Sequence, residues 1–141
     1  MSDQAIRVVV AGALLLHGLG HGGALAALAW LRLRPRTNTG AWTRAHTWLR
    51  PSLSEGNALA VAATLWVISM LGFVAAAAAF WGVILPTGAW QPLAVTSAVV
   101  STAGIVLFLG NWPAFNTLAA MAVNGAVLVG LVVTGWAPPP A

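Results

Sequence analysis

The sequence predicts an all-α integral membrane protein, a bundle of four transmembrane helices with a short interfacial helix between the first and the second. Three observations support this fold class. Hydrophobic residues make up 60% of the 141 residues and charged residues only 6%, a composition that soluble domains do not have. Four apolar segments reach the length that a helix needs to cross a bilayer, roughly 17–25 residues. Turn residues or arginines separate these segments. Because 141 residues leave no room for a second domain, we expect one membrane domain, 1–141.

The first two apolar segments, 6–31 and 57–85, are the longest. The first ends at a cluster of arginines. Because Ala27-Leu28-Ala29 resembles a cleavage site, a secretory signal peptide is the alternative interpretation of this segment. The second segment follows Glu55 and stops at Pro86-Thr87-Gly88, which is a strong turn signal. Both segments are expected to form spanning helices.

The last two segments, 92–109 and 114–136, are separated by a short break. The third begins with Pro92, a residue that suits the first position of a helix. Gly110-Asn-Trp-Pro113 then interrupts the apolar sequence, and the tail Ala137-Pro-Pro-Pro-Ala141 cannot continue a helix. Four spans result.

The arginines predict how the protein is oriented. Five of the six lie between the first two segments, in the loop 32–54: Arg32, Arg34, Arg36, Arg44 and Arg50. Because arginine-rich loops stay in the cytoplasm, we expect a multi-pass protein of a cell inner membrane, with loop 32–54 cytoplasmic and both termini outside. These few charges determine topology and form no surface for nucleic acid. The expected partner is the lipid bilayer.

The same loop contains the predicted interfacial helix. Trp42, Ala45 and Leu49 share one helical face. Arg44 and Arg50 lie away from that face, which is the pattern of a helix lying among anionic headgroups.

Residue types restrict the chemistry. The chain contains no cysteine, tyrosine or lysine, which excludes disulfides, thiolate ligands and several common catalytic groups. Tryptophan is abundant by contrast. Five of the eight tryptophans lie at predicted helix ends, where an indole anchors a helix at the lipid headgroups. They are Trp30, Trp81, Trp90, Trp112 and Trp136.

The stretch HGLGHGG in the first segment is the main functional candidate. His17 and His21 are four residues apart, so both rings project from one helical face. Gly18 and Gly22 form a GxxxG pattern that lets another helix approach closely. Three interpretations stay open: the histidines hydrogen-bond across the bundle, they bind a metal, a tetrapyrrole or a proton, or one of them is catalytic.

A metal ion and a tetrapyrrole are the two kinds of cofactor that this histidine pair could bind. Two histidines give two metal ligands, whereas zinc sites usually need a third or fourth, and His46 and Glu55 are the other strong candidates. A tetrapyrrole would use a histidine as axial ligand, and Ala13 leaves room for a flat ring one turn before His17.

Several further polar residues are expected to line a common interior. They are Glu55, Ser69, Ser97, Ser101, Asn116 and Asn124. Glu55 also fits a capping box, with Ser52 as the N-cap. Asn124 lies near mid-membrane, where an unpaired amide is costly, and we expect it to bridge helices.

The chain resembles a known group of small membrane proteins. The resemblance rests on HGLGH, on Phe80-Trp81, on Trp90-Gln-Pro-Leu-Ala, and on Asn111-Trp-Pro113 followed by an asparagine in the fourth helix. It is to small bacterial four-span proteins whose first helix carries His-Gly-x-x-His. His17 and His21 match that pair, whereas many relatives have a large apolar residue at the position of Gly22. The resemblance implies a fold and no activity.

A fainter resemblance is to the sterol-isomerase type of four-span domain, which keeps His, Glu, Asn and Trp in an intramembrane pocket. The residues of matching type are His17, His21, Glu55, Trp112 and Asn124. Their spacing departs from that pattern, so the likeness is one of residue type.

Three functions of different classes stay open. The favoured one is a non-enzymatic membrane protein, an accessory or structural subunit of a larger assembly or a homo-oligomer, because catalytic groups are scarce and small-residue faces are abundant. The second is a binding protein for an apolar ligand, metal or tetrapyrrole through His17 and His21. The third is an intramembrane enzyme acting on a lipid-soluble substrate.

Overall fold

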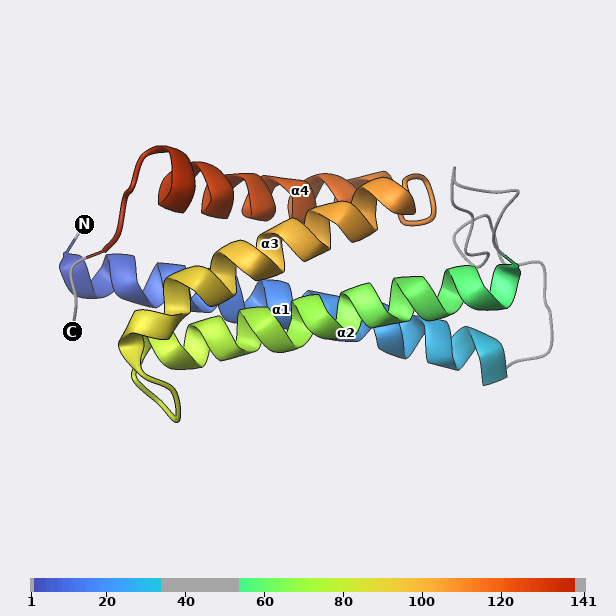
Figure 1. Ribbon diagram of the computed structural model, residues 1–141, viewed down its shortest axis with the longest axis horizontal. Coiled ribbons are helices and arrows are strands. Elements are labelled where there is room, and N and C mark those ends of the chain that lie inside the picture. The colour runs from blue at the N-terminus through green and yellow to red at the C-terminus, as the bar shows by residue number, and fades with distance from the viewer. Residues whose placement is uncertain (1, 34–53, 139–141) are drawn as a thin grey trace.

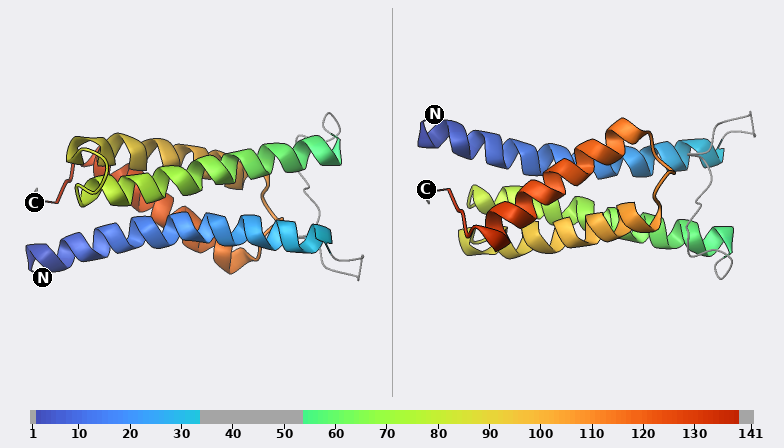
Figure 2. Two further views of the ribbon diagram at one scale, coloured as in Figure 1. Left: turned by 90° about the horizontal axis from the view of Figure 1, so that it is seen from below. Right: turned by 90° about the horizontal axis from the view of Figure 1, so that it is seen from above.

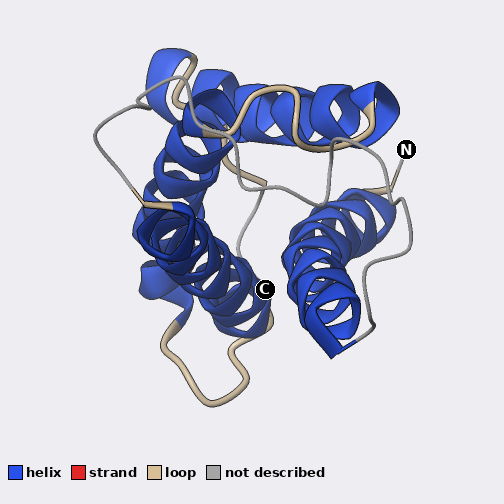
Figure 3. Ribbon diagram, turned by 90° about the vertical axis from the view of Figure 1, so that its right-hand side faces the viewer, coloured by secondary structure: helices blue, strands red, loops and turns tan. Residues whose placement is uncertain are grey.

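The described part of the chain is entirely helical apart from its turns. The structure is a computed structural model that describes residues 2–33 and 54–138. Within these ranges it contains four long α-helices and no strand, as Figure 3 shows along the bundle axis. All four are long and apolar enough to cross a membrane. The predicted fold class is therefore confirmed; the predicted interfacial helix lies outside the described residues.

The four helices follow the predicted segments closely. Figure 1 labels them: α1 (Asp3–Leu33), α2 (Glu55–Phe80), α3 (Trp90–Leu107) and α4 (Ala114–Leu128). A short π-helical turn, Val129–Val133, continues α4. A single 3-10 turn, Thr87–Ala89, leads into α3.

The start of α2 differs from the predicted capping box. Its N-cap is Ser54, whose hydroxyl oxygen accepts a hydrogen bond of 3.3 Å from the backbone N–H of Asn57. Glu55 is therefore the first helical residue and not the third. Both serines fit a cap by residue type, and the sequence did not distinguish Ser54 from Ser52.

The end of α2 also differs, because the helix stops at Phe80 whereas the predicted segment ran to residue 85. Gly82 and Ile84 both have positive φ angles, 66° and 67°. A right-handed helix cannot continue through such residues. Apolar sequence persists to Leu85, so hydropathy alone overestimated the helix.

Consecutive helices pack against one another, but the bundle does not close evenly. The contacts of α1 with α2 and of α2 with α3 are extensive, whereas α1 and α4 meet at few positions. Figure 2 shows α4 running obliquely, with its first turns over α1 and its last turns beside the start of α3, and Figure 1 shows that these first turns stand off from α1. An opening between α1 and α4 follows from this tilt.

Small residues allow the close packing of the first three helices. The buried core on the side of the chain ends is built from Leu14, Phe73, Ala76, Ala77, Ala94 and Ala98. Gly18 on α1 faces α2, where an added Cβ would lie 3.0 Å from Val74 Cγ2 and 3.1 Å from the carbonyl oxygen of Met70. At Gly22 an added Cβ would lie 2.9 Å from Met70 Sδ. The GxxxG face of α1 is thus its contact with α2.

A first test compares two glycines of α1. Gly18→Ala should lower the melting temperature of the purified protein, because the methyl group meets backbone of α2 and overpacking typically costs about 1–3 kcal/mol. Gly12→Ala is the matched control, since an added Cβ there meets nothing within 4 Å. Equal melting temperatures for the two variants, measured in the same detergent, would contradict the close contact.

Candidate functional site

The two histidines of α1 lie together inside the bundle. Their ring centroids are 4.9 Å apart in an edge-to-face arrangement. Phe73 of α2 lies edge-to-face with His17 at 4.6 Å. His21 is only 6% exposed, and both rings lie near the middle of the span Asp3–Ala29.

A chain of hydrogen bonds connects the two histidines through α3 and α4. The ring Nε2 of His17 lies 2.9 Å from Asn124 Oδ1. Asn124 Nδ2 donates to Ser101 Oγ over 2.8 Å, and Ser101 Oγ lies 3.0 Å from Nε2 of His21. Asn124 and Ser101 are fully shielded, with 1% and 0% exposure. The network therefore joins three helices at mid-membrane.

The bonding pattern assigns the protons. Asn124 Oδ1 can only accept, so Nε2 of His17 donates to it, and Nδ1 of a neutral His17 ring carries a lone pair. We assign the hydroxyl proton of Ser101 to its bond with Nε2 of His21, because the described residues give this hydroxyl no other acceptor. His21 then carries its own proton on Nδ1.

The other residues predicted for a polar interior have different environments. Ser69 and Ser97 are buried, and each donates to a carbonyl of its own helix, Leu65 at 2.8 Å and Leu93 at 2.7 Å. Asn116 is exposed in the first turn of α4. The side chain of Glu55 lies outside the described part of the structure.

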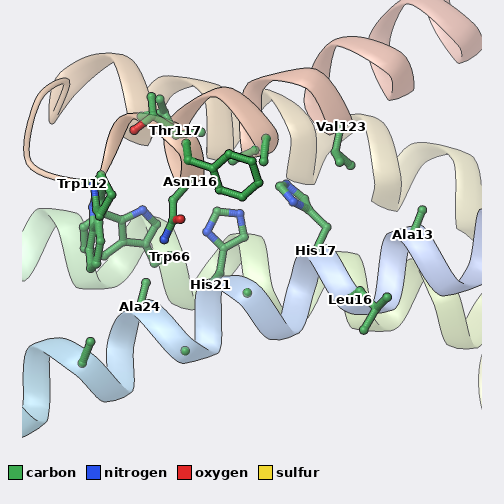
Figure 4. A pocket seen from close by; sticks show the side chains of 18 residues that line it. Ala13, Leu16, His17, His21, Ala24, Trp66, Trp112, Asn116, Thr117 and Val123 are labelled. Carbon is green, nitrogen blue, oxygen red and sulfur yellow. The ribbon is translucent and has the colours of Figure 1, made fainter.

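A cavity of about 780 Å³ lies beside the histidines, between α1 and α4. Figure 4 shows the side chains around it. Small residues make most of the α1 wall: Ala13, Gly20, Gly23, Ala24 and Ala27. The remaining wall includes Leu16, His17, His21, Trp66, Ile105, Trp112, Phe115, Asn116, Ala120 and Val123.

The cavity extends from mid-membrane toward one end of the bundle. One end of the cavity lies near mid-membrane, at Ala13 and Val123. Its other end reaches Trp112 and Pro113 in the turn before α4. Leu16 and Phe115 border it and are 70% and 80% exposed. The cavity therefore opens sideways, toward the surface that lipid covers in a membrane.

The sequence did not predict that two tryptophans, Trp66 and Trp112, would line this site. Trp66 lies far from either helix end, and this was a signal that it is no headgroup anchor. It contacts Trp112 edge-to-face, with ring centroids 5.0 Å apart. Trp112 was expected to keep its indole N–H at the headgroups, but that N–H is buried and has no hydrogen-bond partner in the described chain.

The site has few groups for metal binding. Among the described residues, no cluster of three or more His, Cys, Asp or Glu side chains could hold an ion. Nε2 of each histidine is already hydrogen-bonded, so a ligand atom at that position would displace Asn124 or Ser101. The metal and tetrapyrrole interpretations of His17 and His21 stay predictions.

A second test compares two asparagines of α4. Asn124→Leu removes both amide contacts, each worth about 0.5–2 kcal/mol in a membrane, and should lower the melting temperature clearly. Asn116→Leu makes the same chemical change at a side chain that has no hydrogen bond to any described residue. It should leave the melting temperature almost unchanged. Equal losses in the two variants would show that the network contributes nothing specific.

Comparisons with known proteins add no relatives. No protein-family model, no curated protein and no solved structure matches the chain. The resemblance to bacterial four-span proteins stays a prediction, and functional conclusions depend on the residues described above.

Proposed function

We propose that this protein binds one lipid-soluble molecule in the cavity between α1 and α4. The observation that carries this proposal is the cavity itself. Its volume of about 780 Å³ is within the range of roughly 300–1,000 Å³ that is typical of small-molecule pockets. Its walls are mostly apolar, and a few polar side chains from α1 and α4 converge on it. This combination is the usual composition of a ligand site.

The position of the cavity supports a ligand from the bilayer. Transmembrane helices are held together largely by van der Waals packing, and an empty gap loses those contacts. This gap stays open because Gly20 and Gly23 have no side chain there and Ala24 has only a methyl group. Because the gap opens sideways at Leu16 and Phe115, a molecule dissolved in the lipid could enter without crossing water.

We further propose that the protein lies in a bacterial inner membrane with loop 32–54 in the cytoplasm. The arginines of that loop support this orientation. The described chain begins and ends at the same end of the bundle, as an even number of crossings requires (Figure 1). The cavity extends toward the opposite end, so it would open in the cytoplasmic half of the membrane.

The accessory-subunit function is a second candidate because α4 has a large unpartnered surface. Only 6% of its spanning window is buried, against 22% for α1 and 33% for α3. Lipid or another subunit could cover this surface. A second chain in the native mass spectrum of the detergent extract would favour the subunit function.

The orientation can be tested by cysteine labelling, because the natural chain has no cysteine. Thr87→Cys should react with a membrane-impermeant maleimide added to spheroplasts. Leu109→Cys, which is exposed at the opposite end of the bundle, should react only after the membrane is permeabilised. The reverse pattern would invert the proposed orientation.

Ligand binding can be tested by filling the cavity. Gly20→Leu places an isobutyl group in the cavity, and its Cβ meets nothing within 4 Å. Gly12→Leu is the matched control on the same helix, because its Cβ is equally free and Gly12 does not line the cavity. Native mass spectrometry with the probe decylbenzene should give about tenfold weaker binding, or about 1.4 kcal/mol, for Gly20→Leu alone. Equal binding by both variants would refute the proposed function.

A further inference from the structure

We infer that the ligand carries an uncharged carbonyl oxygen, held between Nδ1 of His21 and the side-chain amide of Asn116. This inference rests on the proposed function and specifies the chemical class of its ligand. It follows from two of the donors beside the cavity that have no partner among the described residues; the buried N–H of Trp112, in the turn before α4, is a third.

His21 provides the first donor. Its Nε2 accepts from Ser101, so the ring proton is on Nδ1. That N–H has no hydrogen-bond partner among the residues that the structure describes, although His21 lines the cavity. The network fixes the ring from the other side and so presents the donor in one orientation.

Asn116 provides the second donor from the facing helix. Figure 4 shows its amide pointing from α4 into the cavity, with the oxygen on the side of His21 and the nitrogen on the side of Trp66. A rotation of the amide about its last side-chain bond brings the nitrogen to the side of His21. The described structure records no hydrogen bond between these two side chains. A carbonyl oxygen has two lone pairs, and it could accept one hydrogen bond from each of the two donors.

The described lining of the cavity favours an uncharged head group. Among the residues that the structure describes, the lining includes no Asp, Glu, Lys or Arg. A charged head in such surroundings would be buried without an opposite charge, at high cost. A neutral carbonyl needs only the two donors, and the apolar wall along Ala24, Ala27 and Val123 accommodates the rest of the molecule.

The test compares two probes that differ only in an acetyl group, which supplies the carbonyl. Decylbenzene and 4-decylacetophenone share the ring and the chain, so the ratio of their dissociation constants isolates the head group. We expect the ketone's advantage over decylbenzene to fall about threefold to tenfold in Asn116→Leu, the range for one neutral hydrogen bond. Decylbenzene is measured in the same variant, so that the ratio of the two dissociation constants removes any change in apolar contacts that the leucine causes.

His21→Phe supplies an independent variant that removes the other donor. A spectroscopic measurement complements the affinities. The infrared stretch of the carbonyl in a ¹³C-labelled ketone should lie at lower frequency in the parent than in Asn116→Leu, because hydrogen bonding weakens the carbonyl bond.

An affinity ratio and a carbonyl stretch that are the same in the parent and in both variants would overturn the carbonyl inference. If decylbenzene binds and is lost in Gly20→Leu, the proposed function would survive that result. If decylbenzene does not bind the parent, the proposed function itself fails.

Discussion

The structure depends on one requirement, that a polar side chain in the middle of a membrane must find partners within the protein. Asn124 meets this requirement at both ends of its amide. Its carbonyl oxygen accepts from His17 and its amide donates to Ser101, so one side chain joins α4 to both α1 and α3. The helices α1 and α4 have few other contacts. The hydrogen bond between His17 and Asn124 is therefore a principal link across the open side of the bundle.

The glycines of HGLGHGG act on two different faces of one helix. Gly18 and Gly22 face α2, where the absence of a side chain permits contact with Met70. Gly20 and Gly23 are on the face toward α4, where an added Cβ would meet nothing within 4 Å. The same residue type thus produces close packing on one face and an open cavity on the other. The difference lies in the course of α4, whose first turns stand off from α1, whereas α2 stays in contact with α1.

Sequence predicted the elements better than their pairing. Hydropathy located the four helices, and the spacing of His17 and His21 correctly placed both rings on one inner face, because these are properties of a single segment. The boundaries of α2 depended on the backbone at Ser54 and Gly82, which composition does not encode. The contact of His21 with Ser101 depends on how α1 and α3 cross, and the cavity depends on the tilt of α4. No periodicity within one helix reports such angles, so these features required the three-dimensional structure.

The structure also changes the question that the two histidines pose. From sequence, packing and binding were competing interpretations of the pair. Each imidazole, however, has two nitrogens with different roles, and the network uses only Nε2 of each ring. With the protons assigned as above, Nδ1 of His17 has a lone pair and Nδ1 of His21 has a proton. Because both rings also line the cavity, the bonds that hold the helices together determine which hydrogen-bonding groups a ligand would meet. Packing is then the means by which the site is organised, and a residue such as Asn124 could alter binding without touching the ligand.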